Sequence, residues 1–177
     1  MKEAAKHRTE WIIHKFRDPD GIVTKLLKKG TSINEVMRLY PDRFIDEERF
    51  EGNCLLNEGI QYFEDILAGI VGSPTLWDNT NARVGVGNSA TGEDPVQTDL
   101  QGASKTYAAM DVTYPSRSSQ ALSWRGTFGD GFAEYAWEEF VVDNGAVSGK
   151  TLNRKVTSKG TKGAGEAWTL TVEITFS

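Results

Sequence analysis

The residues best suited to acid–base or nucleophilic chemistry are few in this chain and lie apart in the sequence. It has two histidines, His7 and His14, and a single cysteine, Cys54. A histidine suits the role of a general base, but a catalytic triad also needs a nucleophile and an orienting acid. No such third partner is recognisable for either histidine. Cys54 precedes Leu55 and Leu56, and we expect it to pack as a small hydrophobic residue. We therefore expect no catalytic triad and no enzyme activity.

Two further motifs match catalytic or cofactor patterns only formally. Glu138 and Glu139 are adjacent on a predicted strand, so they point to opposite faces and do not flank one glycosidic bond. The segment 85–90, GVGNSA, fits the dinucleotide fingerprint G-x-G-x-x-G/A, which requires a strand before the glycines and a helix after them. The continuation TGEDPVQTD contains Pro95 and polar turn formers, so no helix is expected. We predict no bound cofactor.

Metal ions and sugars are the remaining small ligands that these residue types suggest. The Gly- and Asp-rich segments 78–94 and 129–131 have oxygen ligands for calcium, but their spacing fits no EF-hand loop, and turn chemistry explains them. Tryptophans stack on sugars, yet Trp124, Trp137 and Trp168 all lie on predicted strands among apolar neighbours, which favours a core role. We predict no metal site and keep a carbohydrate-binding module as an alternative function.

Composition narrows the class of protein. The 177 residues contain 20 Lys and Arg against 25 Asp and Glu, a formal charge of −5. One cysteine excludes an intramolecular disulfide and any multi-cysteine metal site. The acidic balance argues against a nucleic-acid partner, and no apolar run approaches the roughly 20 residues that cross a bilayer. We expect a globular protein that binds neither nucleic acid nor membrane.

The first fifty residues predict a hairpin and a helix. Apolar stretches at about 10–17 and 22–27 flank the turn sequence Asp-Pro-Asp-Gly at 18–21, which favours two paired strands. Ser32 and Glu35 then form a capping-box pattern, and the helix of about 32–40 is expected to end at Pro41. A helix-turn-helix is the alternative for this stretch, but the following residues are mostly acidic and do not suit DNA.

A second helix is predicted at about 57–70, where Asn57 is the expected N-cap. Ile60, Phe63, Leu67 and Ile70 recur near the helical period, with Ile66 beside them. We expect this apolar face to pack against the rest of the protein; a helix that binds a partner is the alternative.

From Trp77 onwards the chain alternates between short strands and turns. Period-two segments at 82–87, 107–114, 121–128, 133–142, 151–158 and 167–176 are separated by Gly, Ser, Asn and Asp. This pattern predicts a mainly β fold, an antiparallel β-sandwich or jelly roll with an N-terminal α+β extension of a hairpin and two short helices. We place the extension at 1–50 and the sandwich, with its leading helix, at 51–177.

The last strand has the clearest pattern. Trp168, Leu170, Val172, Ile174 and Phe176 share one face, which we expect in the core. The alternate residues are expected to face solvent or a neighbouring chain; they are Thr169, Thr171, Glu173 and Thr175.

Several segments, taken in order, resemble one family of small virion proteins of tailed bacteriophages, usually described as structural or decoration proteins of the head. They are GNCLLNEGI at 52–60, ARVGVGNSAT at 82–91, the run from Thr98 to Tyr107, and LSWRGTFGDGFAEYAWEEFVV at 122–142. LNRKVTSKGTKGAGEAWTLTVEITFS at 152–177 completes the set. The chain departs from the family at about 25–49, where residues are inserted into the expected hairpin. The family carries no established catalytic residues.

The resemblance implies a virion protein that is made in the host cytoplasm and lies on the capsid surface. Its expected partners are the major capsid protein and copies of itself. The 1–50 region is the expected extension toward a neighbour, and the candidate partner-contact residues are Trp11, Ile12, Phe16 and Trp77. The alternative in the same class is a tail, baseplate or connector component of the virion. The alternative from another class is a carbohydrate-binding module that aids host adsorption.

Overall fold

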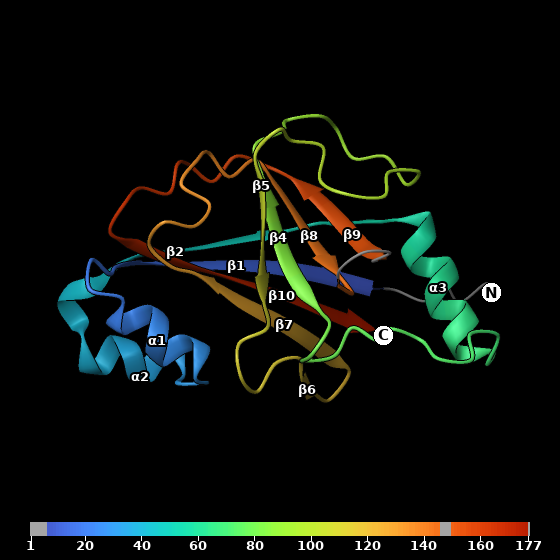
Figure 1. Cartoon of the computed structure of the whole chain (residues 1–177), viewed down its shortest axis with the longest axis horizontal. Coiled ribbons are helices and arrows are strands. Elements are labelled where there is room, and N and C mark those ends of the chain that lie inside the picture. The colour runs from blue at the N-terminus through green and yellow to red at the C-terminus, as the bar shows by residue number, and fades with distance from the viewer. Residues whose placement is uncertain (1–6, 146–149, 177) are drawn as a thin grey trace.

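Two antiparallel sheets of five strands each form the body of the described protein (Figure 1). The computed structural model describes residues 7–145 and 150–176. Within them the first sheet has the strand order β2 (Phe44–Glu51), β1 (His7–Arg17), β10 (Glu166–Phe176), β7 (Ala121–Phe128) and β6 (Ser116–Ser118). The second has the order β3 (Cys54–Leu55), β9 (Thr151–Val156), β8 (Glu139–Asp143), β4 (Arg83–Gly87) and β5 (Lys105–Ala109). The predicted mainly β sandwich is confirmed.

The main core lies between the two sheets and is rich in aromatic rings. Trp137 lies at its centre, with ring centroids 5.0 Å from Phe128 and 4.9 Å from Trp168, both in edge-on geometry. Phe140 of β8 packs against Trp11 of β1 and so links the two sheets. The core role expected for Trp124, Trp137 and Trp168 is confirmed, since all three side chains are buried. Burial of such large rings supplies much of the hydrophobic stabilisation.

The terminal strand β10 follows its predicted alternation for most of its length. Trp168, Leu170, Val172 and Ile174 are buried against the second sheet, as expected. Phe176 at the end of the strand is exposed, so that part of the prediction is wrong. Thr169 is also buried, although it lies on the other face of the strand.

A second, smaller core explains why the outer face of the first sheet is covered near Thr169. Two helices, α1 (Ile22–Lys28) and α2 (Ile33–Leu39), pack on that face. Their buried side chains meet strand residues in a separate cluster made of Phe16, Val23, Leu27, Val36 and Ala167. The insertion therefore forms a third layer at one end of the sandwich (Figure 1).

The predicted hairpin of 10–17 and 22–27 is wrong in its second strand, which is the helix α1. The turn at 18–21 was correctly predicted, but it leads into a helix because the Asp18 carboxylate accepts hydrogen bonds from the backbone N–H groups of Val23 (2.8 Å) and Thr24 (2.9 Å). The hairpin partner of β1 is instead β2, after the two helices. The N-cap role of Ser32 is confirmed, because its hydroxyl accepts from Glu35 N.

Residues 7–50, the described part of the predicted extension, belong to the sandwich and to the helices that cover it. β1 pairs along its whole length with β10 and lies inside the first sheet, so it is part of the sandwich itself. The proposed boundary between residues 50 and 51 falls within β2. Two predicted strands are also shorter than expected. The strand at 107–114 ends at Ala109, and 133–142 is a continuous strand only from Glu139, although Ala136 forms an isolated bridge with Thr161.

Candidate functional site

A polar hollow of about 330 Å³ lies on the outer face of the first sheet, beside the insertion. It is lined by residues of β1, β2, β7 and the segments before α2 and after β5, among them His14, Glu47, Arg49, Tyr114 and Arg125. These include titratable groups of the kinds that catalytic and ligand sites use, and the contacts of each group indicate its role.

Both ring nitrogens of His14 have structural partners. Nε2 lies 2.9 Å from Glu47 Oε2, and Nδ1 lies 3.5 Å from the hydroxyl of Thr169. Burial lowers the pKa of the imidazole, against the opposing attraction of the Glu47 carboxylate. His14 lies on the outer face of the first sheet and is nevertheless buried, beside the start of α2. It joins β1 to β2 and β10.

Arg125 ties the insertion to the sheet. Its Nε donates to Asp111 Oδ2 (2.7 Å) and its Nη2 donates to the carbonyl of Leu27 (3.1 Å) at the end of α1. The Tyr114 ring lies against the guanidinium, and Thr127 donates to the same Asp111 oxygen. Removing either member of such a buried pair leaves an uncompensated charge and is strongly destabilising. The hollow therefore holds a structural network.

A second buried ion pair fixes the long loop between β4 and β5. Glu139 accepts from Arg154 Nη2 (2.7 Å) and from the backbone N–H groups of Gln101 and Gly102. Arg154 also donates to the carbonyl of Thr91. Glu139, one half of the adjacent acid pair, is thus buried and fully engaged in holding this loop.

The candidate partner-contact residues are mostly interior. Trp11 and Phe16 are completely buried, so as surface contacts these two predictions are wrong: both faces of β1 are covered, one by the second sheet and one by the insertion. Ile12 and Trp77 are half-buried. The Trp77 ring packs edge-on against Tyr62 at 5.8 Å.

The apolar face of α3 (Asn57–Leu67) is the largest departure from expectation. Ile60, Phe63, Leu67 and Ile70 are 37%, 49%, 72% and 71% exposed, although their spacing predicted packing against the body. The helix ends at Leu67, three residues before the predicted end, so Ile70 lies just beyond it. We call these four residues together the α3 ridge. The side of the helix that packs is marked by Gly59, where an added Cβ would lie 2.6 Å from the carbonyl oxygen of Thr151 in β9.

The close approach of Gly59 to β9 therefore determines which side of α3 packs against the sheet and which side is left toward solvent. The Tyr62 hydroxyl accepts from Thr75 N on the same inner side. The main contact of the helix with a sheet is with the edge strand β9, and Tyr62 packs against Trp77, so the four ridge side chains stay between 37% and 72% exposed. An uncovered row of large apolar side chains is typical of a site for another protein.

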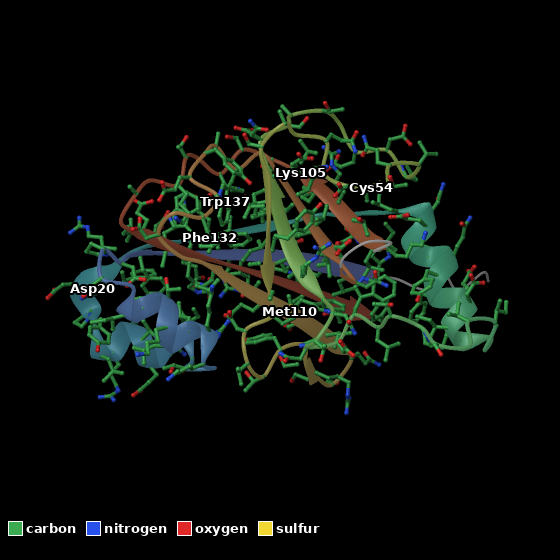
Figure 2. The ribbon with its side chains drawn as sticks, viewed as in Figure 1. Asp20, Cys54, Lys105, Met110, Phe132 and Trp137 are labelled. Atoms are coloured by element: carbon green, nitrogen blue, oxygen red, sulfur yellow. The ribbon has the colours of Figure 1, made fainter. Side chains whose placement is uncertain are left out.

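A second exposed patch lies at the opposite end of the molecule and was not foreseen. Its residues lie on or beside the outer side of α1, and we call them the α1 patch: Lys25, Lys28, Lys29, Val112 and Phe132. Lys28 Nζ lies 5.8 Å from the centre of the Phe132 ring, and Val112 N donates to the Lys28 carbonyl. Phe132 lies on the same half of the molecule as α1 (Figure 2). Lys25 lies three and four residues before Lys28 and Lys29, a spacing that places all three on one face of a helix. The sequence did not indicate this basic face because 22–27 was predicted as a strand.

The structure also bears on metal binding, on the reactivity of the cysteine and on membrane crossing. Among residues 7–145 and 150–176, no three His, Cys, Asp or Glu side chains gather as a metal site requires. Cys54 is half-buried on the edge strand β3, and burial raises the pKa of its thiol. Within the same described part of the chain, no helix has the length and hydropathy needed to cross a membrane. Comparisons with protein families, with curated proteins and with solved structures find no match to this chain.

Proposed function

We propose that this chain is a structural subunit of a tailed-bacteriophage virion that coats or cements the head shell by binding the major capsid protein. The observation that supports the proposal best is the α3 ridge, a row of four large apolar side chains that are between 37% and 72% exposed. The resemblance to head proteins also supports the proposal, because it suggests the capsid as the partner of the ridge. It rests on the segments 52–60, 82–91, 122–142 and 152–177.

The distribution of charged groups favours binding over chemistry. The buried ionisable pairs, Arg125 with Asp111 and Arg154 with Glu139, hold loops and helices in place. Their role is to make a rigid scaffold that presents fixed surfaces. A net charge of −5 also suits a protein on the outer side of a shell, where it does not have to neutralise packaged DNA.

Weak individual contacts are sufficient for a protein that binds a shell in many copies. A shell presents the same binding surface repeatedly, so each contact can be modest while the summed stabilisation is large. A small apolar ridge with a polar rim fits this mode of binding, since only its centre needs to be fully desolvated.

The copy number in purified particles tests the proposal. Quantitative mass spectrometry should give a number of copies equal to, or a simple fraction of, that of the major capsid protein. A handful of copies per particle would favour the tail, baseplate or connector alternative, and absence from the particle would contradict a virion role altogether.

Reconstitution gives a sharper test of binding. Purified protein added to heads that lack it should sediment with them, and Leu67→Asp should bind less than the wild type. Val96→Asp is a matched control, because Val96 is as exposed as Leu67 but lies in the loop between β4 and β5. Equal binding of the wild type and both variants would remove the ridge from the shell contact.

The carbohydrate alternative requires neighbouring exposed aromatic rings. Trp11, Trp124, Trp137 and Trp168 are buried, and Trp77 is half-buried against Tyr62. This arrangement does not favour a sugar-stacking platform. Specific binding on a glycan array would revive this alternative.

A further inference from the structure

The α3 ridge carries a charge pattern that restricts what can cover it. The helix contains the acidic residues Glu58, Glu64 and Asp65 and no lysine or arginine. Glu58 is engaged with Lys150 and the backbone of Thr151. Among the residues that the structure describes, Glu64 and Asp65 have no ion-pair partner. An occupant of the ridge must therefore offer apolar side chains with positive charge around them.

This pattern disfavours pairing of α3 with α3 of another copy. In a two-fold contact the same surface meets itself, so the acidic residues of both helices would be brought together. Like charges placed at a protein contact are repulsive and cost affinity. A symmetric dimer through the ridge would bury apolar area only by bringing those charges together.

The α1 patch has the opposite charge and a similar apolar content. Lys25, Lys28 and Lys29 are exposed on the outer side of α1, and within the described residues none of them has an ion-pair partner. Phe132 and Val112 are both more than half exposed beside them. The patch thus offers an aromatic ring and an aliphatic side chain within a basic rim.

We propose that copies of this chain associate head to tail, with the α3 ridge of one copy docked on the α1 patch of the next. The two surfaces lie at opposite ends of the long axis of the molecule (Figure 1), so one copy can use both at once. Such a heterologous contact closes into a ring if the rotation between copies permits it and otherwise extends into a chain. The association goes beyond shell binding and uses the same ridge, so a copy docked in this way cannot also bind the shell through its ridge and the two contacts compete.

The chemistry of the two surfaces sets the expected behaviour. Four apolar side chains on the ridge and two on the patch make a small contact, so the affinity should be modest and the assembly concentration-dependent. Two ion pairs, one for each of Glu64 and Asp65, should add a salt-sensitive part, since the Debye length falls to about 3 Å at 1 M salt. Raising the salt to about 1 M should weaken the association about tenfold.

Sedimentation velocity on the full chain over a range of concentrations measures the association directly. The wild type should form species larger than the monomer at low salt. Leu67→Asp, which damages only the ridge, and Lys28→Glu, which damages only the patch, should each remain monomeric. Val96→Asp and Arg117→Glu, at exposed positions outside both surfaces, should behave as the wild type.

Mixing the two monomeric variants distinguishes a head-to-tail contact from any symmetric one. Lys28→Glu keeps an intact ridge and Leu67→Asp keeps an intact patch, so an equimolar mixture should form a one-to-one dimer that grows no further. Phe63→Ser and Lys25→Glu form a second pair should either first variant fail to give the wild-type circular dichroism spectrum. A monomeric wild type, unchanged association in both variants, or a mixture that stays monomeric would each overturn the proposal.

Discussion

β10 and α3 have equally regular apolar patterns, yet the apolar face of β10 is buried and that of α3 is exposed. The even-numbered residues of β10 from Trp168 to Ile174 are buried between the sheets. The α3 ridge, which repeats at the helical period with the same clarity, is exposed. Periodicity thus shows that an element has an apolar face, but it does not show what lies opposite that face.

The difference lies in the surroundings of each element. β10 lies between β1 and β7 and has the second sheet in front of it and part of the insertion behind it. α3 approaches a single edge strand, β9, and does so through Gly59. β10 is therefore enclosed by the rest of the fold, whereas α3 packs against the edge of one sheet.

The largest effect should come from the enclosed face of β10. Ile174→Ala should lower the free energy of unfolding by about 2–5 kcal/mol, because it removes a fully buried aliphatic side chain and leaves a cavity. Thr175→Ala, the next residue on the half-buried opposite face, should change it by no more than about 0.5 kcal/mol. Denaturant unfolding of both variants measures this, and equal losses would show that the strand register is wrong.

A smaller loss is expected at the point where α3 meets the sheet. Gly59→Ala places a methyl group 2.6 Å from Thr151 O and 2.7 Å from Leu152 Cα, so the helix has to move away from β9. Overpacking of this kind costs about 1–3 kcal/mol, partly offset by the better helix propensity of alanine. Gln61→Ala on the exposed side of α3 is the control. A neutral Gly59→Ala would mean that α3 is not held against β9.

The outer side of β10 can be tested through pH. Burial beside Thr169 lowers the pKa of His14, so the unfolded chain, in which histidine titrates near 6.5, binds the proton more readily than the folded one. Stability that is fully present above about pH 6.5 should therefore fall as the pH is lowered through that value. His14→Gln should lose this part of the pH dependence in unfolding experiments at about pH 7.5 and 5.5. Parallel curves for the two proteins would show that His14 is not buried in the neutral form.

The smallest effect is expected on the exposed face of α3. Leu67→Ser should change the free energy of unfolding by no more than about 0.5 kcal/mol, since the side chain is already largely in solvent. Thermal or denaturant unfolding at low protein concentration measures the isolated chain. A loss comparable to that of Ile174→Ala would show that the ridge packs against the body after all.

Local signals predicted the parts of the fold that depend on local interactions. Ser32 as a helix cap and the inward face of β10 from Trp168 to Ile174 both depend on near neighbours in sequence, and both are confirmed. The segment 22–27 was mispredicted because its apolar residues suit either a strand or a helix. The interaction that decides between them, the Asp18 carboxylate at the first turn, gives only a weak sequence signal.

The candidate site was harder to predict because it depends on distant parts of the chain. Trp11 and Phe16 were expected at the surface, but β10 joins β1 from the far end of the sequence and α1 and α2 cover its outer side. The ridge was visible as a pattern, whereas its exposure follows from the single close contact at Gly59. The network around Arg125 joins residues from three segments that lie far apart in the sequence, and no spacing reveals it.

The pairing of β1 with β10 also determines when the first sheet can be completed. Arg17 pairs with Glu166, so about 150 residues must be synthesised between the two strands. At common translation rates of about 5–20 residues per second, this takes roughly 10–30 s. During that time β1 can pair with β2 but has an open edge on its other side, which is the kind of edge that attracts unwanted strand partners. Folding of the nascent chain is therefore late, and protection of that edge by a chaperone would matter most before β10 is made.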